Sequence, residues 1–113
     1  MDKLARQALL YDFYGELLTE RQQQVYESVV LEDYSLSEVA ENLGISRQGV
    51  HDMVKRCDRI LEGYEEKLHL VERFQNRKKQ IERICELTED HREDTDRAMR
   101  EIREISRNML EEL

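Results

Sequence analysis

The segment from Ser35 to Tyr64 constrains the fold most strongly, because it predicts two helices joined by a tight turn. Ser35 is a good N-cap for the first helix, and Glu38, three residues on, can complete a capping box. Gly44 can take the left-handed conformation that ends a helix, and Ser46 can cap the helix that follows. This pattern is typical of a helix-turn-helix; the simpler alternative is an ordinary helical hairpin with a solvated face.

Apolar side chains recur at helical spacing in both helices and predict their buried faces. They are Leu36, Val39, Ala40 and Leu43 in the first helix and Val50, Val54, Cys57 and Leu61 in the second. The second helix of a helix-turn-helix presents its first turns to a groove or a partner. We therefore expect the partner-binding residues to be Ser46, Arg47, Gln48, His51, Lys55 and Arg59. For His51 the alternative is a solvent-facing residue without a role.

Composition favours helices along the whole chain. The 113 residues include no proline and four glycines, and 39% of them are charged, so little interrupts a helix. Helices are predicted over residues 3–17 and from Thr19, which can form a capping box with Gln22. The second helix of the motif is expected to run on without a stop past Ile60. The sequence thus predicts an all-α protein, with a helix-turn-helix domain over 1–70 and a charged helical extension over 71–113.

The first predicted helix carries Tyr11, Phe13 and Tyr14 close together. Such aromatic residues either form a core or offer a platform on which nucleic-acid bases stack. We favour the core, because stacking platforms usually have basic neighbours and here the neighbours are Asp12 and Glu16.

The C-terminal extension ends in a helix with a narrow apolar stripe. Residues 88–95 lack apolar side chains and predict a turn, so a helical hairpin or tail follows the long helix. The stripe consists of Ala98, Met99, Ile102, Ile105, Met109 and Leu110. Because a stripe this narrow cannot hold a lone helix in water, we expect it to pack on the preceding helix or to make a homodimer.

The charge is acidic overall and unevenly distributed. The formal net charge is −8, with −4 over residues 1–35, +1 over 36–80 and −5 over 81–113. The weak positive balance around the motif limits non-specific affinity for phosphates. The densest basic group is Arg73, Arg77, Lys78, Lys79 and Arg83. This group either contacts RNA phosphates or is the solvated face of a helix.

No constellation of residues predicts catalysis. There is no glycine-rich phosphate loop and no nucleophile with a base at a supported spacing, so we expect a binding module, not an enzyme, with no cofactor. Cys57 and Cys85 are too few for a disulfide scaffold or a metal site. The histidine and carboxylates in the turn around His91 have nothing to fix their geometry. Without a signal peptide or a long apolar run, the chain is expected to be cytoplasmic, with no membrane insertion.

Several blocks of the sequence resemble known families. The pattern L-T-E-R-Q-Q-Q-V from Leu18, followed by Y-S-L-S-E-V-A-E-N-L-G-I-S from Tyr34, resembles region 4 of bacterial sigma-70 factors. The chain resembles more closely the YlxM family of small bacterial proteins, in the blocks D-Y-S-L-S-E-V-A from Asp33, S-R-Q-G-V-H-D from Ser46 and I-L-E-G-Y-E-E-K-L-H from Ile60. The resemblance covers the first seventy residues well and the acidic tail in general character.

The YlxM resemblance implies an accessory or regulatory role in the signal recognition particle pathway, with the particle's RNA or protein as the partner. The helix-turn-helix motif by itself implies a sequence-specific regulator that binds duplex DNA, with Arg47 pairing with guanine and Gln48 with adenine. The chain departs from the sigma pattern at Gly49 and His51, where basic residues are usual, and at Asp52, whose charge would come close to a phosphate. A third hypothesis, a protein-binding adaptor, fits the negative charge.

Overall fold

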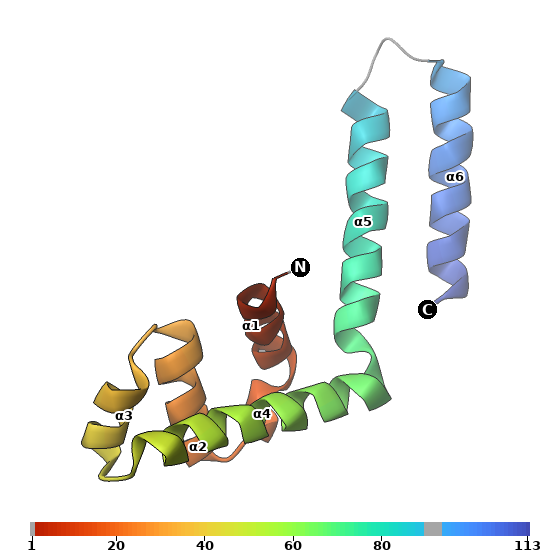
Figure 1. Cartoon of the computed structure of the whole chain (residues 1–113). Coiled ribbons are helices and arrows are strands. Elements are labelled where there is room, and N and C mark those ends of the chain that lie inside the picture. Colours follow the sequence, from red (N-terminus) through yellow and green to blue (C-terminus); the bar gives the residue numbers. More distant parts are fainter. Residues whose placement is uncertain (1, 90–93) are drawn as a thin grey trace. The chain divides into compact units, whose positions relative to one another are not determined.

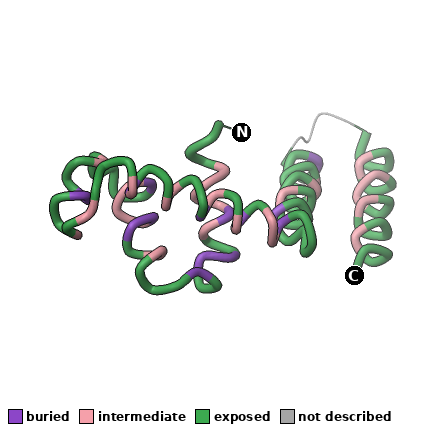
Figure 2. Tube along the Cα trace, turned by 60° about the horizontal axis from the view of Figure 1, so that its bottom comes forward, coloured by how far each residue is buried: buried purple, intermediate pink, exposed green. Residues whose placement is uncertain are grey.

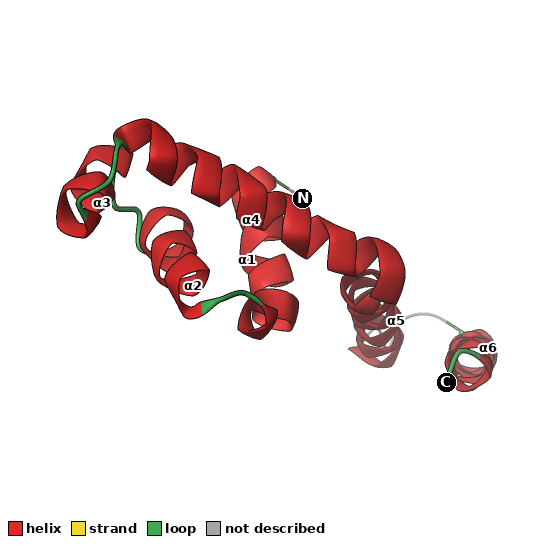
Figure 3. Cartoon of the chain, turned by 90° about the horizontal axis from the view of Figure 1, so that it is seen from below, coloured by secondary structure: helices red, strands yellow, loops and turns green. Residues whose placement is uncertain are grey.

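The computed structural model describes residues 2–89 and 94–113. Over these residues the chain is all-α and has no strand, which confirms the predicted fold class (Figure 1; Figure 3). The elements are α1 (Lys3–Tyr14), the 3-10 helix η1 (Gly15–Leu17), α2 (Glu20–Tyr26), the π-helix η2 (Glu27–Leu31), α3 (Leu36–Leu43), α4 (Arg47–Leu68), α5 (Leu70–Glu89) and α6 (Thr95–Glu111). The chain divides into two compact units, Met1–Val71 and Glu72–Leu113.

The first predicted helix is shorter than expected. Its α-helical part ends at Tyr14, and the chain tightens into a 3-10 turn at Gly15, where the Leu18 N–H donates to the Gly15 carbonyl at 3.1 Å. A Cβ added at Gly15 would lie 2.8 Å from the Tyr11 ring. Tyr11 precedes Gly15 by four residues, so this close packing of ring on backbone is a local contact one turn along the chain.

The predicted helix caps form, with one change of partner. Thr19 and Gln22 make the reciprocal capping box of α2. Ser35 accepts the Glu38 N–H at 3.1 Å, but the Glu38 carboxylate accepts from the Ser35 hydroxyl instead of reaching the backbone. The capping box predicted there is therefore only half formed.

The turn of the helix-turn-helix is as predicted. Gly44 has a φ of 67°, in the left-handed region, and the Ile45 N–H donates to the Ala40 carbonyl at 3.1 Å. The Ser46 hydroxyl then accepts the Gly49 N–H at 2.9 Å and caps α4. Backbone closure of α3 and side-chain capping of α4 leave little freedom in the turn, which fixes where α4 begins.

Two clusters of buried residues hold the first unit together. Figure 2 marks the buried positions in purple along the Cα trace. The larger consists of Leu10, Tyr14, Leu18, Tyr26, Val30, Cys57, Leu61 and Val71. The smaller, within the helix-turn-helix, consists of Val25, Val39, Ala40 and Val50. In α4, Val50, Cys57 and Leu61 are fully buried and Val54 is half-buried, which confirms the predicted stripe. Helix α4 contributes to both clusters and so is fixed along its length.

The three aromatic residues of α1 differ in burial. Tyr14 is 1% exposed and stacks on Tyr64, with ring centroids 6.0 Å apart. Tyr11 is half-buried and stacks on Tyr26 at 5.5 Å. Phe13 is 38% exposed, so the core placement predicted for it is wrong. The wide apolar surface of α1 is only partly covered, because α4 and η2 cover one side of the helix.

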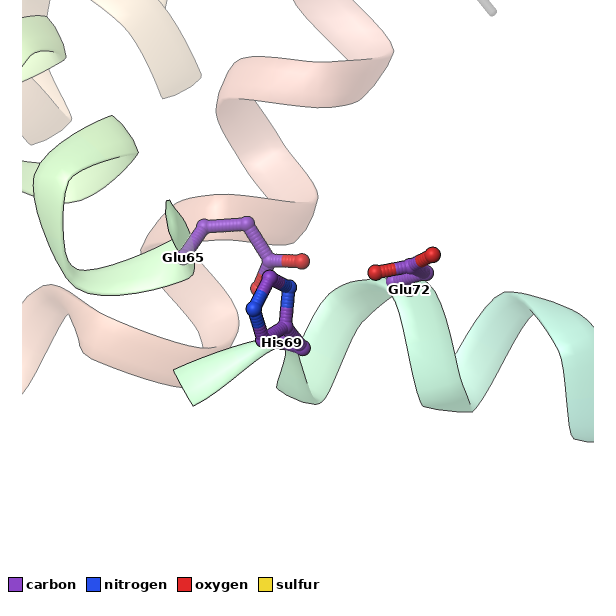
Figure 4. Close-up of side chains that lie close together, drawn as sticks. All are labelled: Glu65, His69 and Glu72. Carbon is purple, nitrogen blue, oxygen red and sulfur yellow. The ribbon is translucent and has the colours of Figure 1, made fainter. Parts of the chain in front are cut away.

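Helix α4 ends at Leu68, so the uninterrupted helix predicted past Ile60 is wrong. Figure 4 labels Glu65 and His69 at this end of α4. His69 has a φ of 56°, and its N–H donates to the Glu65 carbonyl at 2.9 Å. At the start of α5 the Leu70 N–H donates to the Tyr14 hydroxyl at 3.1 Å, and the Val71 N–H donates to Glu65 Oε1 at 2.9 Å. The exposed amides of a helix start are thus satisfied by side chains from α1 and α4.

The second unit pairs α5 with α6, as the predicted hairpin requires (Figure 1). Arg83 on α5 makes a two-pronged ion pair with Glu101 on α6, at 2.8 and 3.1 Å. Asp94 caps α6 by accepting the Asp96 and Arg97 N–H groups. The turn predicted over 88–95, with His91, falls largely on residues 90–93, which lie outside the described residues.

Candidate nucleic-acid and partner interface

The start of α4 carries the first predicted site residues. The Ser46 hydroxyl serves as the cap, so its structural role is clear, while the side chains of Arg47 and Gln48 are exposed. A Cβ at Gly49 would lie 3.1 Å from Ser46 Oγ, so a larger residue there requires a small shift of the capping side chain. The helix start presents one cation, Arg47, beside a neutral amide.

Ser46→Ala should lower the free energy of unfolding by about 1 kcal/mol, because the Gly49 N–H loses its acceptor. Urea unfolding followed by circular dichroism measures the change. Ser37→Ala is the matched control, since Ser37 is exposed on α3 and its side chain makes no hydrogen bond within the described part of the chain. Equal stability of the two variants would contradict the assigned cap.

Asp52 organises the polar face of the first two turns. Gln48 Nε2 donates to Asp52 Oδ1 at 2.9 Å, and His51 Nδ1 lies 3.7 Å from the same oxygen. Gln48 and His51 are therefore both drawn toward a carboxylate whose side chain is 68% exposed. The pair Gln48–Asp52 has the i,i+4 spacing that forms hydrogen bonds on helix surfaces, a signal that the sequence contains.

One turn further on, α4 exposes three cations. Lys55, Arg56 and Arg59 are exposed, and within residues 2–89 and 94–113 none of them makes a hydrogen bond or an ion pair. We call these three residues the α4 cation row. Arg56 is absent from the predicted site residues, although its place beside Lys55 could have indicated it. Unpaired cations on one rigid helix can contact consecutive phosphates without first breaking a protein ion pair.

The acidic residues of α4 that face α1 and α2 are already engaged. Asp58 accepts from the Tyr26 hydroxyl at 2.7 Å and from the Gln7 amide at 3.0 Å. Glu62 pairs with Arg6, and the hydrogen bond from Arg6 lowers the pKa of the Glu62 carboxyl. These carboxylates therefore hold the helices together and do not neutralise the α4 cation row.

The second predicted basic group is not one patch. Arg83 is paired with Glu101 and Glu86, whose hydrogen bonds raise its pKa, so it is less available to a phosphate than the sequence suggests. The side chains of Arg73, Arg77, Lys78 and Lys79 are exposed. Of these four, only Arg73 and Arg77 share a face at i,i+4 spacing, because Lys78 and Lys79 turn progressively around α5.

The two cysteines differ in exposure. Cys57 is fully buried, and burial raises the pKa of its thiol to about 11, so it stays protonated in the core. Cys85 is exposed on α5. Cys57 therefore acts as a small apolar side chain.

The fold and the polar face of α4 together define a helix-turn-helix protein. Residues 1–105 match the UPF0122 family, described as "Putative helix-turn-helix protein, YlxM / p13 like". The chain is 56% identical over 78 residues to a UPF0122 protein of Caldanaerobacter subterraneus, an alignment that covers 69% of this chain and 67% of the relative. It is 42% identical over 94 residues to UPF0122 protein YlxM of Bacillus subtilis, covering 83% and 86%. The chain therefore belongs to the UPF0122 (YlxM/p13-like) family, as the resemblance predicted.

Within the part of the chain that the structure describes, no helix combines the length and the apolar character needed to cross a bilayer.

Proposed function

We propose that this chain is a non-catalytic, cytoplasmic accessory protein of the signal recognition particle pathway, and that it binds the particle through the outer face of α4. The pathway follows from the YlxM resemblance. The observation that carries the binding surface is the α4 cation row, Lys55, Arg56 and Arg59, exposed and unpaired among the described residues on a helix fixed by two buried clusters. Such a row suits the phosphates of the particle's RNA.

A salt-series titration tests this function. The full chain is titrated against the assembled particle and against random duplex DNA of similar length. We expect binding to the particle that weakens as salt rises, with little binding to the duplex. Binding to the duplex alone, with a steep salt dependence, would replace this proposal with the DNA-binding one.

A sequence-specific DNA-binding regulator is the second candidate. The exposed Arg47 and Gln48 at the start of a capped second helix favour it, because these side chains can read guanine and adenine edges in a major groove. Against it stand the carboxylates on both helices of the motif. Helix α3, which would cross the DNA backbone, carries Glu38 and Glu41 and no cation, and α4 presents Asp52.

Asp52→Asn should raise affinity for random duplex DNA about ten-fold at low salt, because like charges a few ångströms apart at a protein surface repel by about 1–4 kcal/mol. Fluorescence anisotropy with a labelled duplex measures the effect. Glu66→Gln makes the same charge change on the same side of α4, roughly 20 Å further along the helix. If both variants bind the duplex equally, Asp52 does not oppose docking of the motif on DNA.

We further propose that the chain forms a homodimer through α5 and α6. In α6, Ala98, Ile102, Ile105 and Met109 are half-buried and no residue is fully buried, while Met99 and Leu110 are 60% and 69% exposed. Sedimentation equilibrium at micromolar concentration should give twice the chain mass of 13.6 kDa. A double change, Met99→Ser with Leu110→Ser, should shift the mass toward the monomer; a wild-type monomer would contradict the proposal.

A further inference from the structure

The part of the helix-turn-helix that precedes α4 is uniformly acidic. Residues 22–46, which include α3 and η2, contain five carboxylates and no lysine or arginine. In a helix-turn-helix docked on DNA, the first helix of the motif crosses the phosphate backbone, which favours cations there. The charge on this segment is the reverse, so it suits a cationic partner instead of a nucleic acid.

A groove with a volume of about 250 Å³ lies between this acidic α3 and the segment formed by α2 and η2. Its lining includes the buried Val39 and four polar residues, Gln24, Ser28, Glu32 and Asn42. Over residues 2–89 and 94–113, the side chains of these four make no hydrogen bond or ion pair. Tyr34, 47% exposed, also lines the groove. The groove thus combines a carboxylate, two amides, a hydroxyl and an exposed aromatic ring.

Backbone hydrogen bonds fix the segment that carries Glu32 and Tyr34. The π-helix places the Glu32 N–H on the Glu27 carbonyl at 2.9 Å, Asp33 takes a φ of 60°, and the Tyr34 N–H donates to the Ser28 carbonyl at 2.9 Å. π-helical turns of this kind occur frequently at functional sites. The groove is therefore formed before any partner arrives, which lowers the entropic cost of binding.

We propose that this groove docks an arginine-bearing segment of a partner protein. The Glu32 carboxylate accepts the two parallel N–H groups of a guanidinium, and the Tyr34 ring offers its face to the same cation. Val39 contacts the methylene stem of the arginine, and the Gln24 and Asn42 amides hydrogen-bond to the partner's backbone. The surface is separate from the α4 cation row, so the inference goes beyond the proposed function: one motif holds a protein segment as well as a phosphate backbone.

Amide chemical-shift mapping of the full chain tests the proposal. The probe is the acetylated and amidated peptide Gly-Arg-Gly-Arg-Gly, and its counterpart with citrulline in place of arginine keeps the shape without the charge. We expect saturable shifts centred on Ser28, Glu32, Tyr34 and Asn42 with the arginine peptide only. Glu32→Gln should weaken binding at least about five-fold, since a charge-assisted pair is lost.

Matched variants decide the outcome. Glu16 is an exposed carboxylate on η1, and Glu16→Gln should leave the affinity for the arginine peptide unchanged. Tyr34→Ala should lower that affinity about three-fold, whereas Tyr34→Phe should not, because it retains the ring face. Shifts spread over all acidic residues, equal affinity of Glu32→Gln and Glu16→Gln, or equal binding of the citrulline peptide would each overturn the proposal. A saturable effect confined to the groove supports it whatever the particle titration gives.

Discussion

Tyr14→Phe should lower the free energy of unfolding by about 2–3 kcal/mol, since it removes a hydroxyl that serves a buried carboxylate and a part-buried amide at once. The hydroxyl donates to Glu65 Oε1 at 2.6 Å and accepts the Leu70 N–H at 3.1 Å. Without it, a carboxylate that is only 7% exposed loses a donor and the first amide of α5 loses its acceptor. A midpoint temperature lower by roughly 10 °C is expected for a chain of this size.

Tyr64→Phe is the matched control for this change. Tyr64 stacks on Tyr14 with ring centroids 6.0 Å apart, but within the described chain its hydroxyl makes no hydrogen bond. Both variants keep the aromatic packing and lose one oxygen. The free energies of unfolding of the two variants, measured by heat and by urea, should therefore differ by most of the predicted effect of about 2–3 kcal/mol, with Tyr14→Phe the less stable. Equal stability would mean that the Tyr14–Glu65 hydrogen bond makes no net contribution.

The pH dependence of stability provides a second readout for the buried Tyr14 hydroxyl. Burial first, and then the hydrogen bond to Glu65, raises the pKa of Tyr14 above its ordinary value of 10.0. Folding thus favours the protonated hydroxyl, and this contribution is complete below pH 10 and lost as the pH rises above it. The stability difference between wild type and Tyr14→Phe should narrow in that alkaline range.

Local signals explain why much of the fold was predictable. The caps at Thr19 and Ser46 and the left-handed Gly44 are each decided within a few residues, and sequence spacing contains that information. The end of α4 at His69 is different. It depends on Tyr14, more than fifty positions earlier in the sequence, which supplies an acceptor for the Leu70 amide only once the chain has folded.

The candidate site was predictable to a similar degree. The exposed face of α4 follows from helical periodicity, so the positions of Gln48, Lys55 and Arg59 were accessible from the sequence. Whether a cation is free depends on which carboxylate folds against it. Arg83 looked equivalent to its neighbours in sequence, yet α6 brings Glu101 to it, whereas nothing described in the structure reaches the α4 cation row.

Replacing Lys55, Arg56 and Arg59 together by alanine should weaken binding to the signal recognition particle by about a hundred-fold near physiological salt. Each lost phosphate contact removes roughly 1 kcal/mol of binding free energy. Each also releases about one counterion fewer, so the slope of log affinity against log salt should become shallower by about two to three. The three side chains are exposed and outside both buried clusters, so the fold should persist. Titration of the variant over a salt series measures both quantities.

A matched triple variant separates specific contact from overall charge. Arg97, Arg100 and Arg103 are exposed on α6, and their replacement by alanine changes the net charge by the same amount. That control should lose less than about three-fold in affinity if the α4 cation row acts through direct contacts with phosphates. Equal losses for both triples would show that only net charge matters. A third variant replaces Arg77, Lys78 and Lys79 by alanine. If this variant, and not the α4 variant, loses most of the affinity for the particle, the phosphate-binding surface lies on α5, because the cations that touch the nucleic-acid backbone determine the salt-dependent affinity.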